Sequence, residues 1–224
     1  MNQTLHLTDL VVGYRQPLLG PVSLSLTSGI HILLGKNGSG KTTLMRTVAG
    51  ILPPLSGSVT LAAGTQVGYL GHQAALSEGL TVGQNLRFWQ RVTQLYAEAG
   101  DLQQLSEQFG LHDLWPRRVR QLSRGQRQRS DLARVGLTQV GLARPGLFLL
   151  DEPLTGLDPL QAQQMRQKMR EWAQHAPLIY STHSLPEALE MSDSFLVVTG
   201  GGLQQLTSHG RRPEAELLRA LEAS

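Results

Sequence analysis

The feature that most constrains the fold is an eight-residue glycine-rich segment that follows an apolar run. Residues 35–42 have the sequence Gly-Lys-Asn-Gly-Ser-Gly-Lys-Thr, and residues 30–34 before them are Ile-His-Ile-Leu-Leu. The pattern G-x-x-x-x-G-K-[ST], placed between a strand and a helix, predicts a phosphate-binding loop. Glycine lets backbone N–H groups curl around phosphates, and the helix that begins near Lys41 turns the positive end of its dipole toward them. The segment therefore requires a strand–loop–helix unit and indicates a nucleotide site.

Apolar runs and helical periodicity alternate through the rest of the chain, which predicts an α/β fold. Strands are expected at residues 5–14, 22–26, 30–34, 58–61, 66–70, 147–150, 178–182 and 195–199. Helices are expected at residues 41–50, 160–175, 186–191 and 212–223. Residues 80–143 lack a strand pattern and carry apolar residues at helical spacing. We therefore expect a P-loop NTPase core with a mixed, largely parallel sheet, a small N-terminal antiparallel β edge and an inserted α-helical subdomain.

The composition excludes several classes of protein and site. The 224 residues contain no cysteine, which excludes disulfides, thiolate metal sites, iron–sulfur clusters and cysteine nucleophiles. No apolar run approaches the roughly 18 residues that a membrane-spanning helix needs. Residues 1–14 lack the basic and continuous apolar regions of a signal peptide. The length suffices for one to two domains, and we expect a soluble intracellular protein.

The net charge of +3 comes mostly from arginine, and seven arginines lie close together in one stretch. They are Arg117, Arg118, Arg120, Arg124, Arg127, Arg129 and Arg134. Such a cluster can contact phosphates or anionic lipid, or it can be the solvated face of a helix. We favour the solvated face, and we expect no nucleic-acid partner, because no aromatic residues interleave with these arginines.

Two adjacent carboxylates follow the apolar run at residues 147–150. A buried parallel strand delivers side chains at its carboxyl end, where open α/β sheets bind ligands. Because neighbouring strand residues point to opposite faces, Asp151 and Glu152 are expected to have different roles. Asp151 suits a position near Mg²⁺, through water, and Glu152 suits a base or orienting group for an attacking water. The alternative is an ordinary strand-ending turn.

Residues 122–126, Leu-Ser-Arg-Gly-Gln, resemble the signature LSGGQ of the ATP-binding cassette family, with Arg124 in place of the first glycine. Arg-Gln-Arg follows, which is also typical of this signature. With the phosphate loop and the acid pair in the family order, nearly the whole chain is similar to the nucleotide-binding subunits of ABC transporters. Ser123 can also cap the helix that follows, and Gly125 allows close approach of the backbone to a phosphate.

The resemblance extends to four further positions. Gln73 resembles the Q-loop glutamine that senses Mg²⁺, and His183 resembles the switch histidine that hydrogen-bonds the γ-phosphate. Asp158 resembles the D-loop residue that contacts the opposite subunit, and Tyr14 resembles the A-loop aromatic that stacks on adenine. Three of the four have a plain alternative: a surface amide for Gln73, a structural histidine for His183 and a strand-end tyrosine for Tyr14.

The resemblance implies a full set of site residues. ATP contacts are expected from Tyr14, Gly35, Asn37, Gly38, Ser39, Gly40, Lys41, Thr42, Thr43, Ser123, Gly125, Gln126 and Asp158. Catalytic roles are expected for Lys41, Gln73, Glu152 and His183, and Mg²⁺ ligation for Thr42, Gln73 and Asp151. Residues 1–224 are expected to form a single nucleotide-binding domain, with an ATP-binding core at residues 1–73 and 144–224 and a helical signature subdomain at residues 74–143.

The resemblance also implies partners. In this family the phosphate loop of one subunit faces the signature of another across ATP, so we expect a head-to-tail dimer with itself or with a homologous ATPase subunit. Closure on ATP and opening after hydrolysis would drive a transmembrane permease subunit. The chain would then be cytoplasmic and peripheral on the inner face of the cell membrane. The permease is expected to dock beside Gln73, Leu76, Phe88 and Trp89, although Phe88 and Trp89 are equally expected as core of the insert. Residues 71–73 and the lack of a C-terminal accessory domain favour an exporter, including the haem-exporter-like subfamily.

The sequence departs from the family pattern in three places. Arg124 adds a cation near the position of a partner's γ-phosphate, or it points away without effect. Residues 135–144 are a few residues longer than the family norm, which puts the end of the signature helix in question. Residues 58–70 are compressed, so the antiparallel edge should be small.

Two other functions stay open. A soluble ABC-type ATPase that acts on nucleic acid or ribosomes predicts long coiled-coil insertions or a second cassette, whereas 48 residues lie between Gln73 and Leu122. A regulatory module that binds ATP without turnover predicts replacement of Glu152 or His183, and both are present. We therefore favour the ATP-hydrolysing subunit of a membrane transporter.

Overall fold

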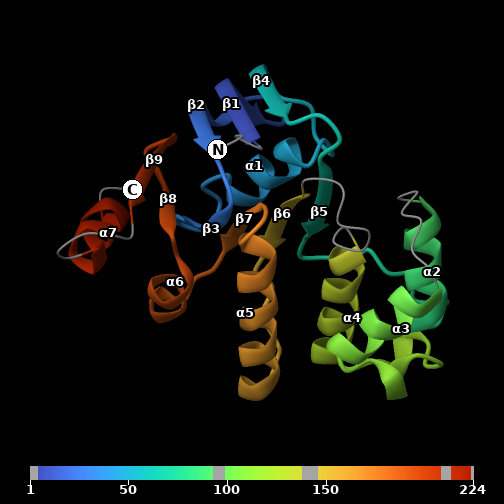
Figure 1. Cartoon of the computed structure of the whole chain (residues 1–224). Helices are drawn as coiled ribbons and strands as arrows, with labels where there is room; N and C mark the ends of the chain where they lie inside the picture. Colours follow the sequence, from blue (N-terminus) through green and yellow to red (C-terminus); the bar gives the residue numbers. More distant parts are fainter. Residues whose placement is uncertain (1–4, 93–98, 138–145, 208–212, 223–224) are drawn as a thin grey trace.

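The computed structural model describes residues 5–92, 99–137, 146–207 and 213–222, and it contains two β-sheets with helices packed around them (Figure 1). The strands are β1 (Leu5–Gly13), β2 (Pro17–Leu26), β3 (Gly29–Leu34), β4 (Ser56–Leu61), β5 (Gln66–Leu70), β6 (Gly146–Asp151), β7 (Pro177–Ser181), β8 (Ser194–Thr199) and β9 (Gly202–Thr207). The helices are α1 (Lys41–Val48), α2 (Val82–Val92), α3 (Ala99–Gln108), α4 (Arg124–Gly136), α5 (Pro159–Ala173), α6 (Leu185–Met191) and α7 (Pro213–Glu222). Two short 3₁₀ turns, His112–Leu114 and Val119–Gln121, lie between α3 and α4.

The larger sheet has six strands in the order β5-β6-β7-β3-β8-β9. Neighbouring strands are parallel throughout except for β8 and β9, which are antiparallel. Parallel strands need crossover connections: α5 connects the neighbours β6 and β7, and α6 connects β7 to β8, which lies on the other side of β3. The carboxyl ends of β3, β6 and β7 therefore meet at one edge of the sheet, where open α/β sheets bind ligands. The expected mixed, largely parallel sheet is confirmed.

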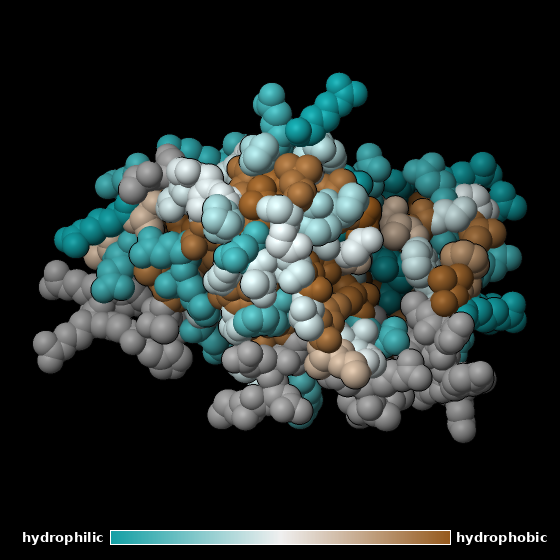
Figure 2. All heavy atoms as spheres, turned by 90° about the horizontal axis from the view of Figure 1, so that it is seen from above, coloured by the Kyte–Doolittle hydropathy of each residue, from teal (hydrophilic) through white to brown (hydrophobic). Residues whose placement is uncertain are grey.

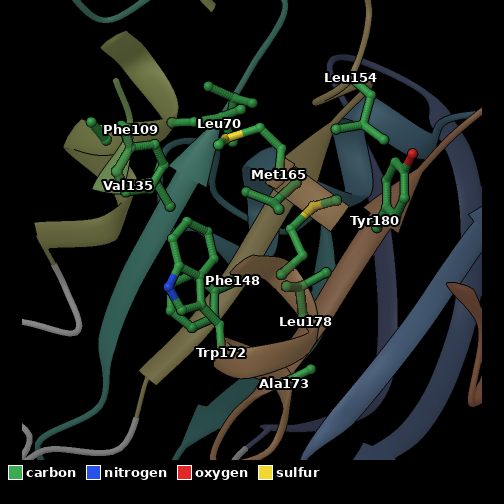
Figure 3. Packing of buried hydrophobic residues seen from close by; sticks show 14 of the residues in the cluster. Leu70, Phe109, Val135, Phe148, Leu154, Met165, Trp172, Ala173, Leu178 and Tyr180 are labelled. Atoms are coloured by element: carbon green, nitrogen blue, oxygen red, sulfur yellow. The ribbon is translucent and has the colours of Figure 1, made fainter. Parts of the chain in front are cut away.

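The large sheet is buried on both faces, and β6 shows how its residues divide between two cores. Leu147 and Leu149 pack with α1 and the N-terminal strands, whereas Phe148 between them packs with α5. Figure 3 shows this second core, in which the rings of Phe148 and Trp172 stack with their centroids 4.8 Å apart. Because side chains alternate along a strand, Asp151 at the end of β6 lies on the α1 side of the sheet.

Strands β1, β2 and β4 form a separate antiparallel sheet in the order β2-β1-β4. Helix α1 lies between the two sheets (Figure 1), and its Leu44, Met45 and Val48 are buried in one core with residues of β1 and β3. The small antiparallel sheet agrees with expectation, but it packs beside the large sheet instead of extending its edge. Figure 2 views this end of the molecule, where hydrophobic residues gather in the middle of the face within a hydrophilic rim.

Helices α2, α3 and α4 occupy the stretch that lacks a strand pattern, and they lie together at one side of the molecule (Figure 1). Leu86 of α2, Leu105 of α3 and Leu132 of α4 are buried in the core that also contains α5. This agrees with the expected helical insertion, while its boundaries at residues 73 and 144 stay a prediction. Among the described residues, no helix combines the length and apolar character needed to cross a membrane.

Two differences from the expected strands have physical causes. The unexpected β9 pairs with β8 through a tight turn in which Gly200 and Gly201 have φ values of 52° and 85°, a hairpin geometry that needs positive φ. Strand β2 begins at Pro17, earlier than expected. Proline has no N–H to donate, but β2 is an edge strand of its sheet, where this donor is not needed. Residues 138–145, which contain most of the stretch longer than the family norm, lie outside the described residues.

The arginine cluster is solvated only in part. Arg117, Arg118 and Arg120 are exposed, as the solvated-face interpretation predicts. The side chain of Arg134, in contrast, is 9% exposed, and its Nε lies 2.5 Å from Oδ1 of Asp131, which is 1% exposed. The solvated-face interpretation is therefore wrong for Arg134, because its charge is paired with a buried carboxylate.

His31 is a buried titratable residue of β3, in the middle of the large sheet. Its Nδ1 lies 2.8 Å from Oγ of Ser194, and its Nε2 lies 3.0 Å from the carbonyl oxygen of Thr27. Burial lowers the pKa of His31, and the Thr27 carbonyl and the Asp193 carboxylate oppose this shift only in part. The folded protein therefore favours the neutral imidazole.

We predict that His31 makes the protein less stable in mild acid. Below about pH 6.5 the unfolded chain binds a proton that the folded chain resists, so the free energy of unfolding falls as the pH decreases. The variant His31→Asn should flatten this dependence between about pH 7 and 5 in urea denaturation series. His112→Asn, at an exposed histidine, is the matched control. Equal pH slopes in the wild type and in His31→Asn would contradict the prediction.

Candidate functional site

The phosphate loop connects the end of β3 to the first residue of α1. Gly35 has a φ of 152°, and a Cβ there would lie 2.9 Å from Oγ of Ser39, so a side chain would strain the backbone and displace its neighbours in the loop. Oγ of Ser39 is itself buried without a hydrogen-bond partner among the described residues. Asn37 and Gly38 are exposed at the tip, and Gly40 precedes the helix with a φ of 102°. A buried hydroxyl without a partner at a helix N-terminus fits a phosphate oxygen.

Lys41 begins α1 and is only 8% exposed. Its Nζ donates to the carbonyl oxygens of Gly35, at 2.7 Å, and Lys36, at 2.9 Å, so the ammonium group lies across the loop. Burial lowers the pKa of Lys41, while the nearby carboxylates of Asp151 and Glu152 oppose the shift. The loop therefore holds one cation close to both carboxylates.

Asp151 is the residue that connects the phosphate loop to the large sheet. It is 3% exposed at the end of β6, and its Oδ2 accepts a hydrogen bond of 2.7 Å from Oγ1 of Thr42. Oδ1 accepts a hydrogen bond of 2.5 Å from Oγ of Ser181, and Nε2 of His72 lies 3.4 Å from Oδ2. Thr43, next to Thr42, is buried in α1. The carboxylate thus joins the ends of β6 and β7 to the first turn of α1.

The residues around Asp151 fit a magnesium ion. The Thr42 hydroxyl, the Asp151 carboxylate and the side-chain amide of Gln73 offer the oxygen ligands that Mg²⁺ prefers. No group of three or more His, Cys, Asp or Glu side chains in the described part of the chain could hold a metal ion. This donor set suits an ion that takes its remaining ligands from water and nucleotide phosphates.

Glu152 follows Asp151 directly but lies in a different environment. Its φ of 51° is left-handed, so the chain turns sharply away from the direction of β6. Its N–H lies 3.2 Å from the carbonyl oxygen and 3.1 Å from Oγ of Ser181. Oε1 lies 2.7 Å from Nε2 of His183, and Oε2 accepts a hydrogen bond of 3.2 Å from Oγ1 of Thr155. Both carboxylate oxygens therefore have a fixed partner, and the group is well oriented.

A cavity of about 550 Å³ lies beside the two carboxylates. Its lining includes His72, Gln73, Arg124, Gln128, Asp151 and Glu152. Gln73 is thus brought to the same cavity as both acids, although the chain separates them by more than 70 residues. Arg124 lines this cavity of its own chain.

The signature residues make contacts within their own chain. Ser123 is the N-cap of α4: its Oγ accepts from the N–H of Gln126 at 3.2 Å, and Oε1 of Gln126 accepts from the N–H of Ser123 at 3.0 Å. A Cβ at Gly125 would lie 2.6 Å from the carbonyl oxygen of Gly156, so glycine is needed here for the close approach of two backbones. In the part of the chain that the structure describes, no hydrogen bond or ion pair joins Ser123, Gly125 or Gln126 to the phosphate loop.

Asp158 and Tyr14 lie at the surface. Asp158 is the N-cap of α5, with Oδ1 accepting a hydrogen bond of 2.9 Å from the N–H of Gln161. Tyr14 is 62% exposed in the turn between β1 and β2, and its hydroxyl accepts a hydrogen bond of 3.4 Å from Nη1 of Arg46 on α1. The side chain of Tyr14 therefore lies next to α1, the helix that follows the phosphate loop.

The three apolar residues of the expected docking groove differ in burial. Leu76 is buried, and Trp89 is partly buried, with its Nε1 donating to the carbonyl oxygen of Ala75 at 2.9 Å. Phe88 is 52% exposed, with its ring in edge contact with that of Trp89. The alternative that the aromatic pair is insert core is therefore wrong for Phe88, because its place on α2 faces solvent.

Four residues at the site were not predicted from the sequence. They are His72, Gln128, Thr155 and Ser181, which contact the two acids or the backbone beside them. The nitrogen Nε2 of Gln128 donates to the carbonyl oxygen of Pro153 at 2.9 Å. Ser181 carried a usable signal, because it directly precedes Thr182 and His183 at the end of an apolar strand.

The sequence is similar to a family model and to several curated proteins. The family model described as "ABC transporter" matches residues 19–155. The "Cytochrome c biogenesis ATP-binding export protein CcmA" of Roseobacter denitrificans is 42% identical over 145 residues, 63% of this chain and 65% of that protein. The "Sulfate/thiosulfate import ATP-binding protein CysA" of Caulobacter vibrioides is 34% identical over 213 residues, 86% of this chain and 60% of that protein. The chain thus spans less than two thirds of these relatives.

Solved structures share the fold. The structure titled "Structure of ATP binding subunit of ABC transporter" has a TM-score of 0.81 and 24% identity, and covers 99% of this chain and 95% of that chain. A bacterial Atm1-family ABC exporter with ATP bound has a TM-score of 0.77 and 22% identity, over 98% of this chain and 40% of that chain. At this identity the likeness concerns the fold alone. The family match and the relatives together establish that the chain belongs to the ABC transporter family, as its ATP-binding domain.

Proposed function

We propose that this chain hydrolyses ATP and that Glu152 orients the attacking water or takes its proton. The observation that carries the proposal is the pairing of Glu152 with His183 at 2.7 Å. This pair lies beside the phosphate loop, whose Lys41 interacts electrostatically with both Asp151 and Glu152. His183 and Thr155 each hold one oxygen of Glu152, so the carboxylate is oriented to take a proton from a water within hydrogen-bond reach. His183, half exposed, remains accessible to a terminal phosphate.

Each part of the site has its own task in this proposal. Residues 35–40 and Lys41 hold the phosphates, and Tyr14 stacks on the base. Thr42, Asp151 and Gln73 hold Mg²⁺, which when bound neutralises charge on the phosphate oxygens. Ser181 keeps the Asp151 carboxylate in place and also contacts the backbone N–H of Glu152. The two acids are thus positioned by one serine.

The proposed assembly is a head-to-tail dimer of two copies, or of this chain with a homologous ATPase subunit. Ser123 is exposed, and its contacts within the chain leave the phosphate loop without a signature partner in the described residues. A second subunit would supply Ser123 and Gly125 to the γ-phosphate, which ADP lacks. ATP therefore binds more tightly to the closed dimer than to the open subunits and favours closure. Hydrolysis removes this difference in affinity.

The dimer would drive a transmembrane permease from the cytoplasmic face of the membrane. The exposed Phe88 on α2, near the loop that carries Gln73, supports a docking surface there. We propose export as the direction, in a haem-exporter-like system, on the support of the similarity to CcmA of Roseobacter denitrificans. The similar CysA of Caulobacter vibrioides is named an import protein, so transport assays with the permease partner must decide the direction.

The variant Glu152→Gln tests the catalytic role. It should bind ATP like the wild type and lose turnover by about 10²–10⁴-fold, the usual range for a general base. Phosphate release measures turnover, and light scattering should show an ATP-dependent dimer. Glu190→Gln, at a surface glutamate paired with Arg166 and Arg170, is the matched control and should behave as wild type. Retained turnover in Glu152→Gln would disprove the catalytic role, and a monomer at all ATP concentrations would contradict the proposed ATP-dependent dimer.

Lys41→Ala and Ser123→Ala should separate binding from hydrolysis. Lys41→Ala removes a cation from the phosphates and should weaken nucleotide binding itself. Ser123→Ala should keep binding and lower hydrolysis by about 10²–10³-fold, as expected for a transition-state donor. Binding is measured with a fluorescent ATP analogue, and melting temperatures correct for the lost helix cap, worth about 1 kcal/mol. An equal loss of binding in both variants would contradict this division.

A further inference from the structure

The loop that carries His72 and Gln73 is held at both ends by two residues of α4. At its start, the carbonyl oxygen of Tyr69 accepts a hydrogen bond of 2.6 Å from Nη2 of Arg134. At its end, the N–H of Ala75 donates to Oδ2 of Asp131 at 3.1 Å. The two backbone anchors therefore bracket His72, which contacts the Asp151 carboxylate, and Gln73, which lines the same cavity.

Asp131 and Arg134 form a buried ion pair one turn apart on α4. Oδ1 of Asp131 lies 2.5 Å from Nε of Arg134, and the two side chains are 1% and 9% exposed. A buried pair of this kind is tolerated only when its remaining hydrogen-bonding atoms also find partners. Here those partners are the backbone atoms of the loop, so the pair and the loop depend on each other.

Packing next to the Asp131–Arg134 ion pair fixes the position of α4 relative to β5. Val135 follows Arg134, and a Cβ at Gly68 of β5 would lie 2.8 Å from its Cγ1. Figure 3 shows Val135 close to Leu70, the last residue of β5. The end of α4 thus packs directly on the strand from which the loop departs.

Trp89 of α2 completes the arrangement. The guanidinium carbon of Arg134 lies 5.0 Å from the centre of its ring, a distance typical of cation–π contact. Its Nε1 also donates to the carbonyl oxygen of Ala75 at 2.9 Å. Both backbone polar atoms of Ala75 are therefore bound to side chains of the helical segment.

We propose that Asp131, Arg134 and Trp89 are positioning residues that fix the loop at residues 71–74 and so set Gln73 and His72 at the Asp151 carboxylate. The proposal rests on the proposed function, in which Gln73 and Asp151 hold Mg²⁺. Nε2 of His72 lies 3.4 Å from Oδ2 of Asp151, so a small shift of the loop changes the surroundings of that oxygen directly.

The same residues connect the loop to two other parts of the molecule. Helix α4 begins beside Ser123 of the signature, so its movement reaches both the signature and the loop. Trp89 is in ring contact with the exposed Phe88, at a centroid distance of 5.8 Å. A partner that presses on Phe88 would therefore act on Ala75 through one side chain.

Trp89→Phe is the mildest test, because it keeps a ring under Arg134 and deletes the hydrogen bond to Ala75. Hydrogen exchange of the peptide covering residues 71–76 should become about fivefold faster, the effect of one lost hydrogen bond. In ATPase assays the Mg²⁺ concentration for half-maximal rate should rise and kcat should fall by about tenfold or less. Binding of a fluorescent ATP analogue without Mg²⁺ should not change, which a general loss of structure would not spare.

Asp131→Asn and Arg134→Lys test the ion pair. Arg134→Lys keeps the charge and loses the fork that reaches Tyr69, so it should affect the loop more than Trp89→Phe does. Asp131→Asn keeps an oxygen acceptor for the N–H of Ala75 and removes the negative charge that pairs with Arg134. Lys168→Gln is the matched control, since Lys168 and Glu171 are also an i,i+3 pair, here on the surface of α5. It should leave hydrogen exchange and the Mg²⁺ dependence as in the wild type.

Unchanged exchange at residues 71–76 in folded Trp89→Phe and Arg134→Lys would overturn the proposed anchoring. Faster exchange with an unchanged Mg²⁺ dependence and kcat would overturn the positioning role, because the loop would then move without consequence at the site. A wild-type chain without ATPase activity would instead contradict the proposed function, and the exchange measurements would still decide whether the loop is anchored.

Discussion

The buried carboxylate of Asp151 holds the centre of this protein together. It lies at the end of β6 and accepts hydrogen bonds from Thr42 at the start of α1 and from Ser181 at the end of β7. A carboxylate that is 3% exposed is stable only with such partners, so the three elements cannot shift independently. The left-handed turn at Glu152 follows at once and directs the second acid to His183. Asp151 therefore fixes how far Glu152, the proposed catalytic acid, lies from the phosphate loop.

Helix α4 arranges the loops around this centre with one of its faces. Gly125 meets the carbonyl of Gly156, Gln128 donates to the carbonyl of Pro153, and Asp131 accepts from the N–H of Ala75. These three positions are three residues apart, which places them along one side of a helix. Each contact reaches the backbone and not a side chain. The helix therefore controls where the loops lie, whatever residues the loops carry.

Much of the fold could be predicted from the sequence because its signals are local. The glycines of residues 35–40 and the apolar run before Asp151 each specify a short stretch of backbone, and both formed as expected. Ser181 contacts a residue 30 positions away, and its local signal is its place directly before Thr182 and His183. The role of Asp131 arises from a residue 56 positions away and has no local signal. The buried state of Arg134 was missed for the same reason: a charge pattern cannot reveal a carboxylate and a carbonyl brought together by folding. Strand β9 has a local signal in the sequence, the Gly200-Gly201 turn before it.

The glycine at position 125 illustrates how a family motif can have a cause inside one chain. The motif suggests that Gly125 leaves room for a phosphate, yet the atom that a side chain would strike is the carbonyl oxygen of Gly156, 2.6 Å away. Any larger residue would separate the start of α4 from the segment that leads to the Asp158 cap. A loss of activity on substitution would then reflect the chain's own geometry. Ser123 is the more informative position, because among the described residues its exposed hydroxyl serves only a helix cap, and the cost of losing that cap can be measured separately.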